Sequence, residues 1–294
     1  MAELTSSQPL DLLAQETRMG AVTLRVANLD AMTAYYRDAV TLTLISRDGD
    51  RSILGRGSTS IVILEHAPEL KHAAPHEAGL FHTAVLFDTE ADLATAVHSV
   101  AQHSPRTFTG SADHLVSKAF YFTDPEGNGV ELYWDRARTE WSWTHGEVDM
   151  ATLRLDRRKF LAESLSEDAI AVAPSRPAKV GHVHLSVGDI PQAREFYVQQ
   201  LGFETTKVMG DQALFVSAGK YHHHMAMNTW TSAGAGRRGP SLGLGLVRIE
   251  LPTPDDIGAL SDRLRHYGVK ARDNGQIVEF DDPWLNVIQV EPKD

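Results

Sequence analysis

Cysteine is absent from this sequence of 294 residues. Its absence excludes disulfide bonds, thiolate nucleophiles, iron–sulfur clusters and cysteine-ligated zinc sites. Basic residues are in the minority, because 28 Lys and Arg stand against 39 Asp and Glu and give a formal net charge of −11. A chain this acidic lacks the broad basic face that binds a phosphate backbone, so nucleic acid is not an expected partner.

Long apolar runs are missing as well. No stretch reaches the roughly 18 apolar residues that a membrane-spanning helix needs, and the opening MAELTSSQPL lacks the basic and then apolar order of a signal peptide. We therefore expect a soluble cytoplasmic protein with no membrane partner. What the sequence does contain is 42% hydrophobic residues, enough for a substantial core, and 14 His, which is the one composition number that points to chemistry.

The chain contains an internal repeat. VTLRVANLDAMTAYYRDAVTL, from Val22, aligns without a gap with VHLSVGDIPQAREFYVQQLGF, from Val183, at a separation of 161 residues. Each copy reads as a strand with alternating apolar residues, a polar turn and an amphipathic helix. Two further pairs of segments match less closely, one starting at Gly79 and Gly243 and one starting at Thr123 and Asp281. The long ungapped register of the first pair argues against chance similarity.

The repeat defines four modules, near residues 19–70, 77–136, 179–232 and 241–292. Each module begins with a strand and a helix and continues through short strands, which predicts an α+β fold. The Pro-rich APSRPAK, which follows a predicted short helix, is the natural boundary between two domains. The expected division is an N-terminal extension at 1–18, modules one and two at 19–136, a connection at 137–178, and modules three and four at 179–294.

Two modules carry a histidine on their opening strand. His82 opens the second module in HTAVLFD, and His182 takes the equivalent place in the third module in HVHLSVGD. The second module ends with a tight turn, DPEGNG, and a strand that carries Glu131. Two imidazoles and one carboxylate form the 2-His-1-carboxylate set, which leaves adjacent coordination positions open on Fe(II) for a substrate and O₂.

The first and fourth modules lack these residues. Ala21 and Leu246 stand at the histidine positions, and Gln289 stands at the position of the glutamate. Only a cavity between modules two and three could therefore hold a metal, and we expect these two modules to face each other.

Alternatives remain at each ligand position. A lone histidine on a strand is more often a hydrogen-bonded core residue than a ligand, and Glu131 could face solvent. His184 shares a strand face with His182 and could replace it as a ligand. Three candidate ligands at matching module positions nevertheless favour the metal site.

These segments carry a resemblance to a known family. Four βαβββ modules, strand openings led by histidine and the DPEGNGVELY ending resemble the vicinal oxygen chelate superfamily. That resemblance implies two domains whose curved half-barrel sheets surround a metal cavity. DHLVS, DPEGNGVELY and SAGKYHHHMAMNTW are similar to stretches of the bacterial catechol 2,3-dioxygenases, which are type I extradiol ring-cleaving enzymes. The resemblance covers residues 19–290.

The resemblance implies roles for individual residues. The family's metal ligands fall on His82, Glu131 and His182. A tyrosine ten residues before the ligand glutamate binds the substrate oxygen in this family, and Tyr121 matches it. A further substrate-contacting histidine falls on His114. The acid–base histidine falls within the triplet of His222, His223 and His224, where we favour His223.

The function implied is a metal-dependent extradiol dioxygenase that acts on a small catechol-type aromatic diol with O₂, as in aromatic catabolism, and uses Fe(II) or Mn(II). Two alternatives stay open: another metal-dependent enzyme of the superfamily, such as a glyoxalase-type isomerase or a lyase, and a non-enzymatic protein that binds an aromatic compound. An isomerase usually requires a second carboxylate ligand, and Gln289 does not supply one. A binding protein leaves the matching ligand positions unexplained. A homo-oligomer is compatible with the acidic composition.

Overall fold

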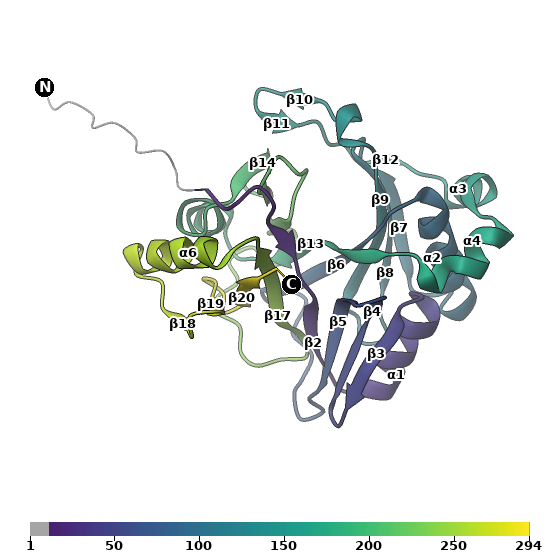
Figure 1. Cartoon of the computed structure of the whole chain (residues 1–294), viewed down its shortest axis with the longest axis horizontal. Helices are drawn as coiled ribbons and strands as arrows, with labels where there is room; N and C mark the ends of the chain where they lie inside the picture. Colours follow the sequence, from purple (N-terminus) through teal and green to yellow (C-terminus); the bar gives the residue numbers. More distant parts are fainter. Residues whose placement is uncertain (1–11, 294) are drawn as a thin grey trace, which may run out of the picture.

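The computed structural model describes residues 12–293, so the first eleven residues of the expected N-terminal extension lie outside the described residues. The structure is α+β, as predicted, and two nine-stranded sheets form its body. The helices α2, α3 and α4 lie together on one side of the molecule, and α6 lies on the opposite side (Figure 1). Within the described residues, no helix is long and apolar enough to cross a membrane.

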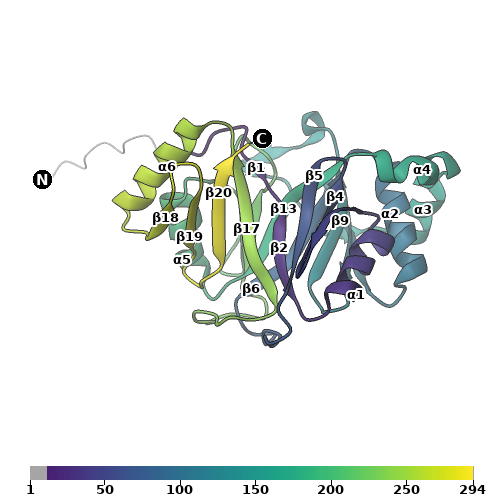
Figure 2. The same cartoon turned by 60° about the horizontal axis from the view of Figure 1, so that its bottom comes forward.

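The first sheet has the order β12 (Leu153–Arg154), β7 (Phe108–Asp113), β8 (Ser117–Thr123), β9 (Gly129–Asp135), β6 (Gly79–Phe87), β13 (Ala178–Ser186), β16 (Met225–Asn228), β15 (Ala213–Ser217) and β14 (Glu204–Met209). The second sheet has the order β18 (Ala271–Asp273), β19 (Val278–Asp281), β20 (Val287–Pro292), β17 (Gly243–Leu251), β2 (Val22–Val26), β5 (Thr59–His66), β4 (Arg51–Arg56) and β3 (Thr43–Asp48), and β1 (Arg18–Met19) also pairs with β17. Figure 2 shows β20, β17, β2 and β5 side by side.

The helices are α1 (Leu29–Ala34), α2 (Glu90–His103), α3 (Arg157–Ser164), α4 (Glu167–Val172), α5 (Ile190–Arg194) and α6 (Pro254–His266). Helical turns are η1 (Tyr35–Ala39), η2 (Arg138–Glu140), η3 (Ala173–Ser175) and η4 (Glu195–Gln200), and a small hairpin joins β10 (Trp143–Thr144) to β11 (Glu147–Val148). Side-chain caps fix the helix starts, because Thr89 accepts a hydrogen bond from the amide of Asp92 in α2 and Thr253 forms a capping box with Asp256 in α6.

Each sheet combines one module from each half of the chain. β6 of the second module pairs antiparallel with β13 of the third, and β2 of the first module pairs antiparallel with β17 of the fourth. Modules two and three therefore share one sheet, as the ligand pattern predicts. One hydrophobic cluster runs through both sheets, and its largest buried side chains include Trp284, Tyr36, Tyr197, Phe87, Phe120, Phe203 and Phe280.

A tyrosine–aspartate hydrogen bond occurs twice at repeat-related positions. The Tyr36 hydroxyl donates to Asp124 at 3.1 Å, and the Tyr197 hydroxyl donates to Asp282 at 2.8 Å. Asp124 also accepts from the backbone amide of Asn128, which closes the turn before β9. Burial raises the pKa of Asp124 to about 6. The repeat therefore extends from the sequence to the polar contacts that hold consecutive modules together.

Candidate metal centre

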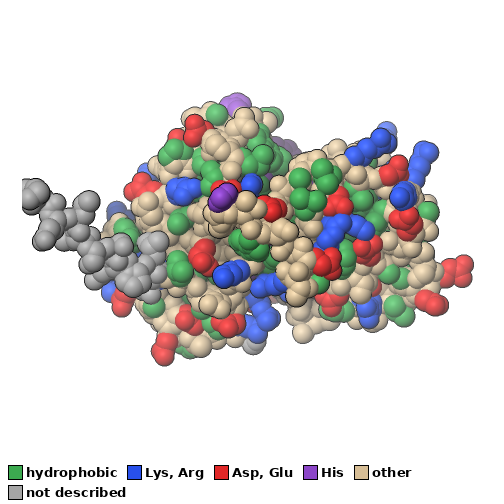
Figure 3. Space-filling model, turned by 90° about the horizontal axis from the view of Figure 1, so that it is seen from above, with side chains coloured by type: hydrophobic (Ala, Val, Ile, Leu, Met, Phe, Trp, Pro, Cys, Tyr) green, Lys and Arg blue, Asp and Glu red, His purple; other side chains and the backbone are tan. Residues whose placement is uncertain are grey.

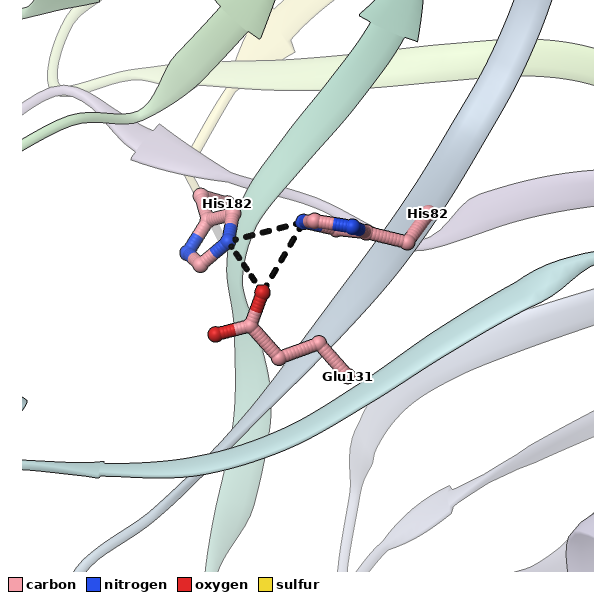
Figure 4. Close-up of side chains that lie close together, drawn as sticks. All are labelled: His82, Glu131 and His182. Carbon is pink, nitrogen blue, oxygen red and sulfur yellow. Dashed lines mark hydrogen bonds and ion pairs between the residues drawn. The ribbon is translucent and has the colours of Figure 1, made fainter. Parts of the chain in front are cut away.

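Three adjacent strands in the middle of the first sheet carry the three predicted ligands. His82 lies on β6, Glu131 on β9 and His182 on β13, and β6 lies between the other two strands. Ala84 is the register partner of both Glu131 and His182. Because His82 is two residues from Ala84, all three side chains leave the sheet close together on one face, and Figure 4 shows them converging.

The donor atoms of these residues form a small triangle. Nε2 of His82 and Nε2 of His182 are 3.3 Å apart, and Oε2 of Glu131 lies 2.9 Å from the first and 3.1 Å from the second. Three ligand atoms bound at right angles to one divalent metal, at about 2.1 Å, lie about 3.0 Å from one another. The triangle matches one face of an octahedral site, so this buried His–Glu–His group could bind a metal.

The electrostatics of the centre agree with this use. Burial lowers the pKa of His182 to about 4, although the charge of Glu131 acts in the opposite direction. Burial alone would raise the pKa of Glu131, but the charges and hydrogen bonds of His182 and His82 hold that pKa well below its usual value. At neutral pH the centre therefore contains a carboxylate and a neutral His182, which are the forms that ligate metals.

His184 lies beside this group and is engaged elsewhere. Its Nε2 accepts a hydrogen bond from the side-chain amide of Asn228 at 3.0 Å. Its ring packs against Phe81 and Trp230, with centroid distances of 4.9 and 5.4 Å. The arrangement therefore favours His182 over His184 as the ligand.

The group opens onto a cavity of about 400 Å³. All six predicted site residues line this cavity: His82, His114, Tyr121, Glu131, His182 and His223. Among the triplet, only His223 lines it, whereas His222 and His224 face other partners. The ring of His223 lies 4.1 Å from that of His182, measured between centroids. Burial and then the neighbouring histidines lower the pKa of His223 well below its usual value, so its imidazole is neutral near pH 7.

Tyr121 and His114 form a hydrogen-bonded pair on the cavity wall. Nδ1 of His114 lies 2.7 Å from the carbonyl oxygen of Ala151, which can only accept, so Nδ1 carries the proton. Nε2 of His114 then accepts the Tyr121 hydroxyl at 2.7 Å. Burial and the charge of Glu131 raise the pKa of Tyr121 well above its usual value. Tyr121 therefore stays a phenol with a proton to donate.

The remaining cavity wall combines apolar side chains with His184 and the hydroxyl residues Ser111, Ser117 and Thr152. Phe81 of the central strand β6 contributes to the apolar part of the wall. The other large apolar lining residues are Val116, Met150, Met209, Phe215 and Trp230, of which Met209 lies on the edge strand β14. Among the described residues that line the cavity, none is Lys or Arg. A planar apolar ligand without a negative charge suits such a wall.

A polar cluster of Asp135, Tyr133, Tyr221 and His222 lies beside His223 and was not predicted from the sequence. Asp135 accepts hydrogen bonds from Nε2 of His222 at 2.8 Å and from the Tyr221 hydroxyl at 2.7 Å. The Tyr133 hydroxyl lies 2.8 Å from that of Tyr221. One signal was present, because Glu131, Tyr133 and Asp135 alternate along β9 and so share its cavity-side face.

The second sheet has no such centre at its repeat-related positions. Arg248 is the register partner of Gln289, as Ala84 is of Glu131. The Arg248 guanidinium donates a hydrogen bond to the Thr23 hydroxyl at 2.9 Å. A cation therefore lies at the place in the second sheet that corresponds to the candidate ligands of the first.

Comparisons with known proteins place this fold among known ones. The chain is 30% identical over 278 residues to the Catechol-2,3-dioxygenase of Bacillus subtilis (strain 168), covering 92% of this chain and 95% of that protein. A structure titled as a putative dioxygenase from Bacillus subtilis superposes with a TM-score of 0.63 at 13% identity, covering 96% of this chain and 86% of that one. Glyoxalase I from Zea mays superposes with a TM-score of 0.58 at 17% identity, covering 94% and 92%. At these identities the two structures establish the shared fold.

A family model also matches the chain, over residues 18–132 and 179–289. These two ranges correspond to the two halves of the internal repeat and contain His82, Glu131 and His182. The chain belongs to the Glyoxalase/Bleomycin resistance protein/Dioxygenase superfamily.

Proposed function

We propose that this protein is a metal-dependent extradiol dioxygenase that opens the ring of a catechol-type diol with O₂. The observation that carries the proposal is the His82–Glu131–His182 group, which shares one cavity with a neutral histidine and a phenolic donor. The relationship to the Catechol-2,3-dioxygenase of Bacillus subtilis supports the same reaction. When bound, Fe(II) or Mn(II) would supply the positive charge and the open coordination positions that a diol and O₂ require.

His223 would serve as the proton acceptor. Its neutral ring lines the cavity beside His182, so a diol placed at the metal centre would lie within its reach. A histidine that is neutral near pH 7 can take a hydroxyl proton as the substrate binds and return a proton later in the reaction. His222 and His224 are held by other groups and are not candidates for this role.

Tyr121 and His114 would orient the substrate. The Tyr121 hydroxyl remains protonated and is already held by a hydrogen bond to His114. A small shift of this hydroxyl would let it donate to a substrate oxygen without loss of its own proton. A pre-positioned donor of this kind lowers the barrier because it needs little reorganisation during the reaction.

The apolar wall would hold the ring and exclude water. Phe215 and Val116 approach the cavity from opposite edges of the sheet. Because no described lining residue is Lys or Arg, a carboxylate on the ring would be desolvated without a partner. We therefore infer a preference for catechols whose ring substituents are uncharged.

Metal content and oxygen consumption test the proposal. Anaerobically purified wild-type protein should contain about one equivalent of iron or manganese by elemental mass spectrometry, and His82→Ala should lose it. The exposed His76 provides a matched control, because His76→Ala should keep the metal. Wild-type protein should then consume O₂ when catechol is added. Bound metal without O₂ uptake on any catechol would rule out the dioxygenase and favour another metal enzyme of the superfamily, whereas protein without metal would favour an aromatic-binding protein.

A further inference from the structure

We propose that Asp135 is a positioning residue that acts through His222 to fix the tautomer of His223, so that Nδ1 of His223 carries the proton and Nε2 is the bare nitrogen offered to the cavity. The inference rests on the proposed role of His223 as the proton acceptor. It concerns which nitrogen of that ring is free, because an imidazole accepts a proton only at the nitrogen that lacks one.

The first link joins Asp135 to His222. Oδ1 of Asp135 lies 2.8 Å from Nε2 of His222. A carboxylate can only accept, so Nε2 of His222 must carry its proton. The other carboxylate oxygen, Oδ2, accepts the Tyr221 hydroxyl at 2.7 Å. Both oxygens of Asp135 are thus engaged, and the carboxylate is held in one orientation.

The second link joins the two histidine rings. Nδ1 of His222 lies 2.7 Å from Nδ1 of His223, and one of the two nitrogens has to donate. A neutral His222 with its proton on Nε2 has a bare Nδ1, which can only accept. With His222 in this single-proton form, His223 donates from its own Nδ1. Its single proton is committed to His222, and Nε2 is left as the proton acceptor.

Packing holds the chain of hydrogen bonds in place. His222 is 1% exposed, and its ring lies 4.1 Å from the Tyr221 ring and 5.2 Å from the Trp141 ring, measured between centroids. The ring of Tyr133 packs beside both His182 and His222, with centroid distances of 4.9 and 6.1 Å. His222 therefore has little freedom to rotate and present its nitrogens differently. Outer partners of this kind commonly fix the tautomer of a functional histidine.

The test reads the tautomer directly. The full-length chain, labelled with ¹⁵N-histidine and freed of paramagnetic metal, should show His223 with a protonated Nδ1 and a bare Nε2 by NMR. The resonances of His223 are identified as the set of signals that is missing from the spectrum of His223→Gln. In Asp135→Asn the new amide can donate to Nε2 of His222, which moves the His222 proton to Nδ1. His222 would then donate to His223, whose proton should appear on Nε2.

Two variants separate positioning from damage to the fold. Asp135→Glu keeps a carboxylate and should restore the wild-type tautomer of His223. Tyr221→Phe removes only the partner of Oδ2 and should leave that tautomer unchanged. In the metal-loaded enzyme, kcat for catechol should fall by about 10- to 100-fold in Asp135→Asn, with metal content and KM close to wild type.

The outcomes distinguish this inference from the proposed function. A wild-type His223 that carries its proton on Nε2, or an Asp135→Asn variant with the wild-type tautomer, would overturn the role of Asp135 whether or not the enzyme cleaves catechol. If the NMR spectra show the predicted tautomers but the protein consumes no O₂ with any catechol, the role of Asp135 in positioning His223 is supported and the proposed dioxygenase activity is excluded. If Asp135→Asn does not fold, the comparison of wild type with Asp135→Glu and Tyr221→Phe still decides which nitrogen is protonated.

Discussion

The Nε2 atoms of His82 and His182 lie 3.3 Å apart and 100 residues apart along the chain. Both nitrogens also face the same oxygen of Glu131. Without a metal, two imidazole nitrogens and a carboxylate oxygen are buried together with too few protons for each to form a hydrogen bond. This arrangement lowers the stability of the folded protein. With a metal, each atom has a partner.

Metal should therefore stabilise the folded protein. Ligand present at about 100 times its dissociation constant adds about 2.7 kcal/mol to the free energy of unfolding. We expect the thermal unfolding temperature of metal-free protein to rise on anaerobic addition of Fe(II) or Mn(II). His182→Ala should show no such rise, and His76→Ala should behave as wild type. An equal rise in His182→Ala would place the metal elsewhere.

Acid should destabilise the metal-free protein. His182 has a folded-state pKa of about 4, below the value of 6.5 for an unperturbed histidine. Between pH 6.5 and pH 4 the histidine is protonated in the unfolded chain but neutral in the folded chain. The contribution of His182 to the free energy of unfolding is therefore fully present above pH 6.5 and is lost as the pH falls toward 4. The loss should approach about 1.4 kcal/mol per pH unit for one such histidine.

Urea unfolding at pH 7, 6 and 5 measures this loss. The pKa values of His184 and His223 are also lowered by burial, so the total slope should exceed that of one group. Replacing His184 by Asn should reduce the slope by removing one titrating group. A free energy of unfolding that is constant from pH 7 to 5 would contradict these buried neutral histidines.

Removal of the Tyr121 hydroxyl should weaken catalysis without loss of metal. Tyr121 is next to Glu131 in strand register but is not part of the donor triangle. One hydrogen bond to a charged substrate oxygen contributes about 1.5–3 kcal/mol, so kcat/KM of Tyr121→Phe should fall about 10- to 100-fold. Oxygen uptake and elemental analysis on the same sample check both statements. An unchanged kcat/KM would remove Tyr121 from the substrate contacts.

A cationic side chain introduced at the cavity wall should allow catechols with a negatively charged substituent to bind. Met209 lines the cavity and is 48% exposed, so a longer polar side chain there can reach solvent. Met209→Arg should bind 3,4-dihydroxyphenylacetate about fivefold more tightly than wild type, which corresponds to about 1 kcal/mol for a partly solvated ion pair. Calorimetric titration under anaerobic conditions measures the change. Met209→Gln should show no gain, and neither variant should change the affinity for unsubstituted catechol.

The face drawn in Figure 3 shows Lys and Arg side chains interspersed with Asp and Glu. No broad basic area appears on that face.

The pairing of modules could be predicted from the sequence because of a chemical constraint. His82 and Glu131 need a third ligand, and the fourth module offers Leu246 and Gln289 where ligands would stand. Only the third module has a histidine at the matching place, so convergence on one metal requires β6 and β13 to be neighbours, as they are.

Contacts between distant side chains could not be predicted in this way. Asn228 lies 44 residues from His184, and Asp135 lies 87 residues from His222. Nothing in the local pattern of either segment shows these contacts, because they depend on the curvature of the sheet and on an irregular segment before β16. The sequence therefore indicated the histidine triplet but not which groups hold its members.

The exchange of modules between the two sheets has a consequence for biosynthesis. When only the first half of the chain has been synthesised, His82 and Glu131 are present, but His182 and β13, which pairs with the second edge of β6, are not. The nascent chain exposes the edges of β2 and β6 until the second half arrives to cover both. Binding of a metal at the proposed centre would therefore require synthesis to pass β13. A product truncated before β13 would lack the complete ligand set and leave both strand edges unpaired, which favours aggregation or proteolysis.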